Sequence, residues 1–273
     1  LVLRNMGDFI LTQIFPDTPI EAIHIAFMTI VVMGAILGLQ TLARAAQIFF
    51  PWLVLLFLLF VMFVCPQMKI ENIQPYFEIG LKPLLRASVP LVGLPYMEMI
   101  LLLMIFPFVT EVKRRSRAMI LGGLSGGAVL IICTALIVLV LSPEIASKHI
   151  FPTYALAKKV SLGNFMQRME VVIAIIWFLT IYFKITLCFY IAVTTLADLL
   201  NLKEYRPLVL PLGMATVAFS LAVYPNIAFI ETFTSEIWPV YAMTFSLFFP
   251  LLLLAVSAVR RIPKTKKTGP GKG

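Results

Sequence analysis

Long, nearly uncharged apolar runs recur along this chain and limit what it can fold into. A helix needs about 20 apolar residues to cross a hydrocarbon core about 30 Å thick. Backbone groups must be hydrogen-bonded internally in lipid, and the runs do not alternate as barrel strands do, so each is predicted to be a helix. We expect seven spans, at residues 20–42, 48–64, 88–110, 118–141, 167–199, 207–223 and 236–259.

The composition agrees with a chain that lies in a bilayer. Hydrophobic residues make up 61% of the 273 residues, charged residues make up 13%, and the mean hydropathy is +1.00. Soluble domains are roughly half apolar and a quarter charged. The net charge of +9 is concentrated between the apolar runs, which indicates membrane topology rather than a nucleic-acid surface. The sequence therefore predicts an all-α polytopic membrane protein that binds no nucleic acid.

Lysine and arginine residues determine the expected orientation. They cluster at residues 113–117 and again after residue 259. An even number of predicted spans separates these segments, so both can face the cytoplasm, as the positive-inside rule favours. Residues 263–273 are rich in Lys, Gly and Pro, and we expect them to form a disordered cytoplasmic tail after a transmembrane domain at residues 1–262.

The chain opens at Leu1, without an initiating Met, and an apolar segment runs from there to Phe15. We expect a fragment that lacks its N-terminus, with this segment as the remaining part of a span. Arg4 and Asp8 are four residues apart and share one face of the predicted helix. In a span both would face the interior of the bundle, whereas on a surface helix both would be solvated.

An interruption divides the span predicted at residues 88–110. Pro95 cannot donate a backbone hydrogen bond, and Gly93 lets the chain leave helical geometry. Discontinuous spans of this kind build substrate sites near the midplane of transporters, although a plain proline kink also fits the pattern. We therefore predict Gly93, Leu94, Pro95 and Tyr96 as ligand-binding residues.

Two charged residues fall inside predicted spans. Glu98 follows the interruption, and Lys184 lies in the middle of the span at 167–199. A charge at this depth costs a few kcal/mol unless it is paired or hydrated, so we predict that both flank a polar pathway. A structural ion pair that only joins two helices is the alternative. Trp177 and Thr180 are predicted to line the same pocket, with ordinary aromatic packing as the alternative for Trp177.

Other chemistry is not indicated by the sequence. The three cysteines form no CxxC pair, and the two histidines, His24 and His149, are far apart. No nucleophile–base arrangement, nucleotide motif or metal-ligand spacing occurs, so we expect no enzymatic activity, no metal and no cofactor. The glycine-rich stretch at residues 122–127 is predicted to allow close helix packing.

Several short motifs, taken in order, resemble the spore germination permease family. Residues 93–102 look like the sixth-span signature of that family. Residues 151–153, then 163–170, then Trp177, resemble its pattern before and into the eighth span. Further matches are the turn at residues 224–226 and the chain end at residues 260–262.

The resemblance implies a fold and a role. Family members are similar to amino acid–polyamine–organocation transporters, which implies a LeuT-like fold with a five-plus-five inverted repeat, here from late span 3 to span 10. It also implies a protein of the bacterial cell or spore inner membrane, beside a larger membrane subunit and a lipoprotein subunit. Such a subunit would sense, or also transport, a small nutrient such as an amino acid to trigger germination. An active amino acid or cation transporter and a scaffold without a ligand are the alternatives.

Overall fold

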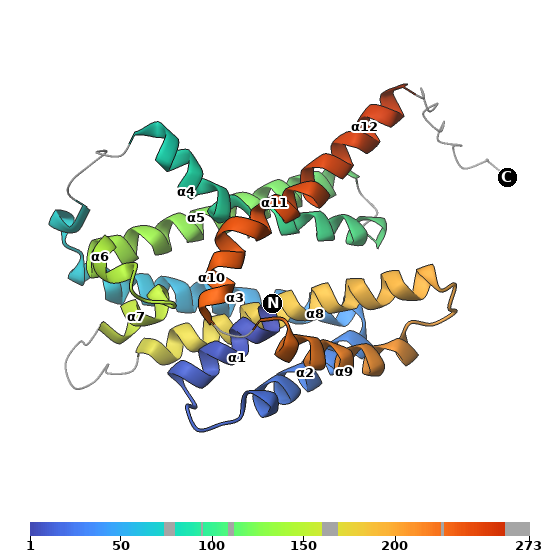
Figure 1. Cartoon of the computed structure of the whole chain (residues 1–273), viewed down its shortest axis with the longest axis horizontal. Coiled ribbons are helices and arrows are strands. Elements are labelled where there is room, and N and C mark those ends of the chain that lie inside the picture. Colours follow the sequence, from blue (N-terminus) through green and yellow to red (C-terminus); the bar gives the residue numbers. More distant parts are fainter. Residues whose placement is uncertain (74–79, 94, 109–111, 160–168, 225–226, 260–273) are drawn as a thin grey trace. The chain divides into compact units, whose positions relative to one another are not determined.

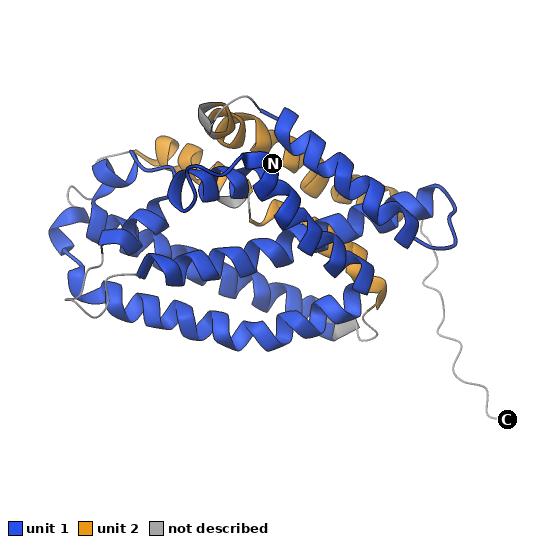
Figure 2. Ribbon diagram, turned by 90° about the horizontal axis from the view of Figure 1, so that it is seen from below, with its two compact units in different colours: residues 1–78, 109–227 blue, residues 79–108, 228–273 orange. Residues whose placement is uncertain are grey.

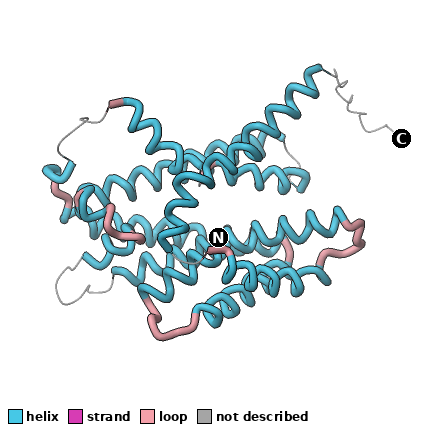
Figure 3. The backbone as a smooth tube through the Cα atoms, viewed as in Figure 1, coloured by secondary structure: helices cyan, strands magenta, loops and turns pink. Residues whose placement is uncertain are grey.

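The computed structural model describes residues 1–73, 80–93, 95–108, 112–159, 169–224 and 227–259, and every regular element in these segments is a helix (Figure 3). Contacts divide the chain into two units (Figure 2). Unit 1 comprises residues 1–78 and 109–227, and unit 2 comprises residues 79–108 and 228–273. In both units, segments that are far apart in the sequence pack together.

Unit 1 is a bundle of long apolar helices with shorter helices at its ends. α2 packs against α1, α8 and α9, and α3 and α7 both pack against α8 (Figure 1). At 1.5 Å per residue, the 31 residues of α8 give a helix about 46 Å long. The elements are α1 (Val2–Gln13), α2 (Ile20–Leu37), α3 (Leu39–Val64), η1 (Cys65–Gln67), η2 (Ile70–Ile73), α5 (Val112–Leu141), α6 (Pro143–Ala146), α7 (Pro152–Lys159), α8 (Met169–Leu199) and α9 (Arg206–Ala222).

Unit 1 has an apolar core and also many apolar side chains on its surface. Buried side chains from α1, α2, α7 and α8 form one cluster, in which Val31, Leu156 and Val193 are inaccessible to solvent. Large apolar side chains nevertheless also cover the outside, and Phe50 on α3 and Ile131 on α5 are 63% and 71% exposed. Apolar surface of this extent marks a membrane or protein contact in a folded protein.

A glycine separates the first two long helices. α2 ends at Leu37, Gly38 has φ of 87°, and α3 begins at Leu39. Glycine adopts positive φ without the steric cost that a Cβ atom would bring. The expected span at residues 20–42 is therefore shorter in the structure, and its last residues belong to α3 instead. Hydropathy alone cannot locate such a turn, because the apolar run continues through it.

Five helices in the described segments are long and apolar enough to cross a membrane: Ile20–Leu37, Leu39–Gln67, Ser116–Leu141, Met169–Leu199 and Phe233–Ala258. Two further predicted spans correspond to shorter apolar helices, Met97–Phe108 and Arg206–Ala222. The predicted class, an all-α polytopic membrane protein, is therefore confirmed. The helix Met97–Phe108 is short because the interruption after Gly93 separates it from the preceding helix.

Unit 2 contains one interrupted helix and one long, irregular one. α11 packs against α4 and against η3, which is a 3₁₀-helix, and η3 also packs against η5. The second helical stretch contains two π-helical turns, η4 and η5, each of which inserts an extra residue into the helical ladder. The elements are α4 (Leu81–Gly93), η3 (Met97–Phe108), α10 (Ile227–Thr232), η4 (Phe233–Ile237), α11 (Trp238–Met243), η5 (Thr244–Phe248) and α12 (Phe249–Val259). The expected tail at residues 263–273 lies outside the described residues.

Candidate functional site

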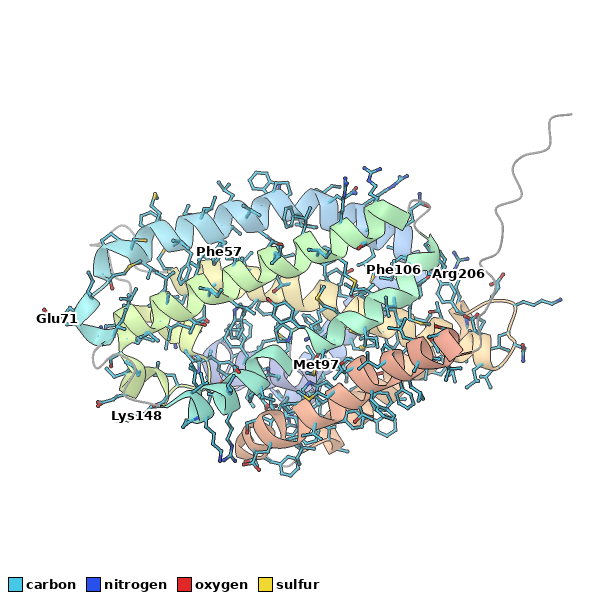
Figure 4. The ribbon with its side chains drawn as sticks, turned by 90° about the horizontal axis from the view of Figure 1, so that it is seen from above. Phe57, Glu71, Met97, Phe106, Lys148 and Arg206 are labelled. Carbon is cyan, nitrogen blue, oxygen red and sulfur yellow. The ribbon has the colours of Figure 1, made fainter. Side chains whose placement is uncertain are left out.

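The interruption predicted at residues 93–96 lies between α4 and η3. α4 ends at Gly93, which is buried, and η3 begins at Met97. Figure 4 labels Met97 and Phe106 along η3. The sequence thus located the change of backbone conformation correctly. Leu94, one of the predicted ligand-binding residues, lies outside the described residues.

Close packing within unit 2 accounts for the glycine at this point. A methyl group in place of the Gly93 hydrogen would lie 3.3 Å from Cβ and 3.4 Å from Cα of Pro239 on α11. After the interruption, Pro95 is exposed and the Tyr96 side chain is 39% exposed. Glu98 follows in the first turn of η3 and is partly buried. The interruption therefore places a carboxyl group next to a backbone that has left α-helical geometry.

The other predicted site residues lie along α8 in unit 1. The Trp177 ring packs against Phe9 and Phe151, with ring centroids 4.8 and 5.8 Å away. The Thr180 hydroxyl donates to the Ile176 carbonyl oxygen at 2.8 Å on an exposed face of the helix. Lys184 is partly buried, in the middle of the helix. Trp177 thus belongs to an aromatic cluster, whereas Thr180 lies at the surface of the unit.

The predicted site residues divide between the two units. Gly93, Pro95, Tyr96 and Glu98 belong to unit 2, and the three residues of α8 belong to unit 1. Each group is defined within its own unit, so the pairing of Glu98 with Lys184 and a pocket shared by both groups remain predictions.

A buried charge cluster joins the beginning of the chain to the end of α9. Nε of Arg4 lies 3.2 Å from Oδ1 of Asp8, and the Tyr224 hydroxyl donates to Oδ2 of the same carboxylate at 2.9 Å. The Arg4 guanidinium also lies over the Tyr224 ring, 5.3 Å from its centroid. Asp8 is only 5% exposed. Of the two interpretations of this segment, the structure therefore supports the one in which Arg4 and Asp8 face the interior of the bundle.

His24 on α2 makes a second buried polar contact with α9. Its Nδ1 lies 2.8 Å from the Ser220 hydroxyl of α9, and that hydroxyl is also 2.7 Å from the Val217 carbonyl oxygen. The imidazole is inaccessible to solvent, and its Nε2 faces Gly7 without a hydrogen-bond partner. We call Arg4, Asp8, His24, Ser220 and Tyr224 the polar network. It connects α1, α2 and the end of α9 through groups buried among apolar side chains.

Sequence reasoning identified only the local part of the polar network. The spacing of Arg4 and Asp8 is visible in the sequence, because residues four apart share a helix face. Ser220 and Tyr224 show the same spacing, but their partners are 196 and 216 residues away. A lone His24 in an apolar run was the available signal, because a buried polar group needs a partner.

No group of three His, Cys, Asp or Glu side chains in the described segments could hold a metal ion. The polar network contains one carboxylate and one imidazole, and the carboxylate already accepts from Arg4 and Tyr224. The polar network therefore links helices and offers no set of ligands for a metal ion.

Comparison with known proteins finds spore germination proteins. The family model described as spore germination protein matches residues 1–230. Spore germination protein KB of Bacillus subtilis (strain 168) is 24% identical over 272 residues, which cover 98% of this chain and 73% of that protein. Putative spore germination protein YfkT of the same organism is 28% identical over 243 residues, which cover 88% of this chain and 66% of that protein.

Spore germination protein YndE of Bacillus subtilis (strain 168) is 24% identical over 264 residues, 95% of this chain and 70% of that protein. The chain thus spans between 66% and 73% of the length of these curated relatives. No solved structure matches the chain.

Proposed function

Because the chain belongs to the spore germination protein family, we propose that it is the permease-like membrane subunit of a germinant receptor, which senses a small nutrient such as an amino acid. The proposed fold is the LeuT-like five-plus-five inverted repeat, and the proposed location is the spore inner membrane with the C-terminus in the cytoplasm. The proposed partners are a larger membrane subunit and a lipoprotein subunit. No enzymatic step is part of this role.

The interruption between α4 and η3 is the observation that carries the proposal. Leaving α-helical geometry between Gly93 and Met97 frees backbone groups that must find partners in a low-dielectric surrounding. In this proposal a small polar nutrient provides those partners, and the Glu98 carboxylate attracts the ammonium group of an amino acid. Broken spans bind substrates in this way in transporters of several folds.

Lys184 and Trp177 on α8 are the proposed second part of the nutrient pathway. An ammonium group in the middle of a long apolar helix is costly unless it faces a partner or water. Lys184 would attract the carboxylate of an amino acid, while Trp177 would present an apolar face. Nutrient binding would then stabilise one of two conformations of the subunit, and the partner subunits would respond to that shift.

Substitution of Glu98 tests the sensor role. We expect Glu98→Gln to raise the nutrient concentration for half-maximal germination by about tenfold, because a charge-assisted contact with the nutrient is lost. Germination would be measured on spores that carry the variant in place of the wild-type chain, with the amount of protein measured in parallel. Glu236→Gln is the matched control, because Glu236 is an exposed carboxyl group of the same unit. If both variants respond alike, or if response falls only as protein amount falls, Glu98 is structural.

An active amino acid or cation transporter is the second candidate, and it is favoured by the two charged residues, Glu98 and Lys184, within predicted spans. Charged groups inside spans often mark transport pathways. Uptake of a labelled nutrient into vesicles that contain the protein separates the two roles. Concentrative uptake would identify a transporter, whereas saturable binding without uptake would identify a sensor. Absence of both would leave the scaffold role.

A further inference from the structure

A hollow of about 470 Å³ opens in unit 1 where the ends of α1 and α5 meet α6 and α7. We call this pocket the basic hollow. Its polar lining residues are Gln13, Lys148, His149, Lys158 and Lys159. Figure 4 shows Lys148 near one end of unit 1 and Arg206 near the other. The volume falls within the range of small-molecule pockets, roughly 300 to 1,000 Å³.

The charge of the basic hollow is of one sign. Its three lysines are joined by a histidine, and no Asp or Glu occurs among the described residues that line it. The nearest acidic residue in the sequence, Glu144 on α6, is exposed and does not belong to the lining. Like charges that share a hollow repel one another, and the repulsion is larger beside protein than in bulk water. An anion in the hollow would be attracted to each lysine, and this attraction would offset the repulsion between the lysines.

Two of the lysines are held in place by neutral groups. Nζ of Lys158 donates to Oε1 of Gln13 at 3.0 Å and lies 4.7 Å from the centroid of the Tyr154 ring. Nζ of Lys159 donates to the carbonyl oxygen of Val140 at 2.7 Å. Neutral partners orient an ammonium group without cancelling its charge, and each ammonium has three hydrogens to donate. Both lysines therefore keep donors for a further acceptor.

The remainder of the lining is apolar. Leu141, Ile145, Ile150 and Phe151 border the hollow beside the lysines. Low-dielectric walls concentrate the field of nearby charges and favour counter-ions in the hollow. The apolar side chains also offer a surface for an apolar part of a ligand. The lining therefore suits a compact molecule with an oxyanion at one end.

Membrane topology does not account for these lysines. In the proposed orientation the basic hollow lies on the side away from the cytoplasm. The positive-inside rule favours Lys and Arg on the cytoplasmic side only, so it predicts no basic cluster here. The cytoplasmic end of unit 1, by contrast, carries Lys203 and Arg206 as that rule favours. The basic cluster at the outer end therefore calls for a different physical explanation.

We propose that the basic hollow is a binding site for the carboxylate or phosphate group of a small anionic ligand. This site is separate from the proposed nutrient site at Glu98 and does not depend on it. The oxyanion would accept hydrogen bonds from Lys148, Lys158 and Lys159, and the apolar part would lie against Phe151. A soluble organic anion and the headgroup of an anionic phospholipid share this chemistry.

Binding in the basic hollow has a direct structural connection to α8. Phe151 lines the hollow, and its ring packs against Trp177 of α8 and Phe9 of α1. Tyr154, which lies under the Lys158 ammonium, packs against Phe9 at a centroid distance of 5.1 Å. A ligand that presses on Phe151 or moves Lys158 therefore acts on the aromatic cluster around α8.

The test uses the full chain in lipid nanodiscs. In one arm the lipid is phosphatidylcholine, and binding of benzoate and of phenyl phosphate is measured by calorimetry. In the second arm phosphatidylglycerol is mixed in, and retained lipid is measured by native mass spectrometry. The variant is Lys148→Gln/Lys158→Gln/Lys159→Gln, which keeps hydrogen-bond donors and removes charge. The matched control, Lys69→Gln/Lys82→Gln/Lys203→Gln, makes the same change in net charge outside the basic hollow.

We expect saturable binding by the wild type in at least one arm, with a Kd below about 1 mM for the soluble probes. The hollow variant should weaken that binding by about tenfold or more, because charge-assisted hydrogen bonds are lost, while the control should change it less than about twofold. Loss of benzoate or phenyl phosphate binding would identify a soluble ligand, and loss of retained phosphatidylglycerol would identify a lipid. Equal binding by the hollow variant and the wild type, or no saturable binding in either arm, would overturn the proposal.

A single charge reversal keeps the proposal testable if the triple variant does not fold. Lys148 is exposed at its position beyond α6, so Lys148→Glu should fold like the wild type. We expect it to weaken binding more than Lys148→Gln does, and we expect added salt to weaken wild-type binding, since the attraction is electrostatic. Identical binding by both Lys148 variants would contradict the site.

Discussion

The polar network and the basic hollow are both built partly from α1, but the two regions arrange charge in opposite ways. In the network, Asp8 is buried and its carboxylate is shared by Arg4 and Tyr224. In the hollow, three exposed lysines lie together, and the two on α7 donate to neutral acceptors. Buried charge must be compensated within the protein, whereas exposed like charge is tolerated because water screens it. The first region should therefore determine stability, and the second should determine binding.

Removing the carboxylate should have the largest effect on stability. Asp8→Asn leaves the Arg4 guanidinium without its counter-ion in a nearly dry position, and we expect a loss of about 3 kcal/mol in the free energy of unfolding. The measurement is denaturant unfolding in detergent micelles. Replacing both partners, as Arg4→Met/Asp8→Asn, should recover more than half of the loss. A double variant as unstable as Asp8→Asn would show that the charge pair itself is not what matters.

Filling the space at Gly7 should come next. A methyl group there would overlap Nε2 of His24 and lie 2.6 Å from its Cδ2, so either the buried His24 ring or the two helices would have to shift. We expect Gly7→Ala to cost about 1–3 kcal/mol, the usual range for overpacking. Gly122→Ala on α5 is the control, because nothing lies within 4 Å of the added methyl group. Equal melting temperatures for the two variants would contradict the close approach of α1 and α2.

Removing one hydroxyl from the network should have a smaller effect. Tyr224→Phe deletes the donor to Asp8 and should cost about 1–2 kcal/mol. Tyr241→Phe, at a side chain that is 55% exposed, should cost much less. A loss as large at Tyr241 as at Tyr224 would argue against the Asp8 contact.

The stability difference between wild type and Tyr224→Phe should also depend on pH. Burial, and next the hydrogen bond to Asp8, raises the pKa of Tyr224 above its ordinary value. The stability that this neutral phenol contributes is complete below the unfolded pKa of about 10 and is lost as pH rises above it. The gap in stability between wild type and Tyr224→Phe should therefore shrink above about pH 10. A gap that stays constant through that range would show that Tyr224 titrates normally.

The basic hollow should give the smallest stability change. We expect Lys148→Gln to alter the free energy of unfolding by less than about 0.5 kcal/mol, since the side chain is exposed and its removal relieves repulsion. A loss above about 1 kcal/mol would mean that this lysine is structural, which would remove the contrast between the two regions.

How far the sequence predicts the candidate site can be judged from particular residues. The interruption at Gly93 was predictable, because glycine and proline act on their own backbone. The turn at Gly38 was not, since a glycine within an apolar run is compatible with a continuing helix. Trp177 was predicted as a possible lining residue, and the structure places it in an aromatic cluster with Phe9 and Phe151.

The order of apolar and charged residues is enough to identify a helical, membrane-embedded protein. The helical rise per residue and the cost of unsatisfied backbone groups in lipid both act locally, so no tertiary contact is needed for this prediction. Packing in three dimensions brings His24 to Ser220, brings Tyr224 to Asp8, and gathers Lys148, which follows α6, with Lys158 and Lys159 of α7 beside Gln13. Those contacts join residues that are up to 216 positions apart. Their partners are selected by helix packing, which a hydropathy pattern does not encode.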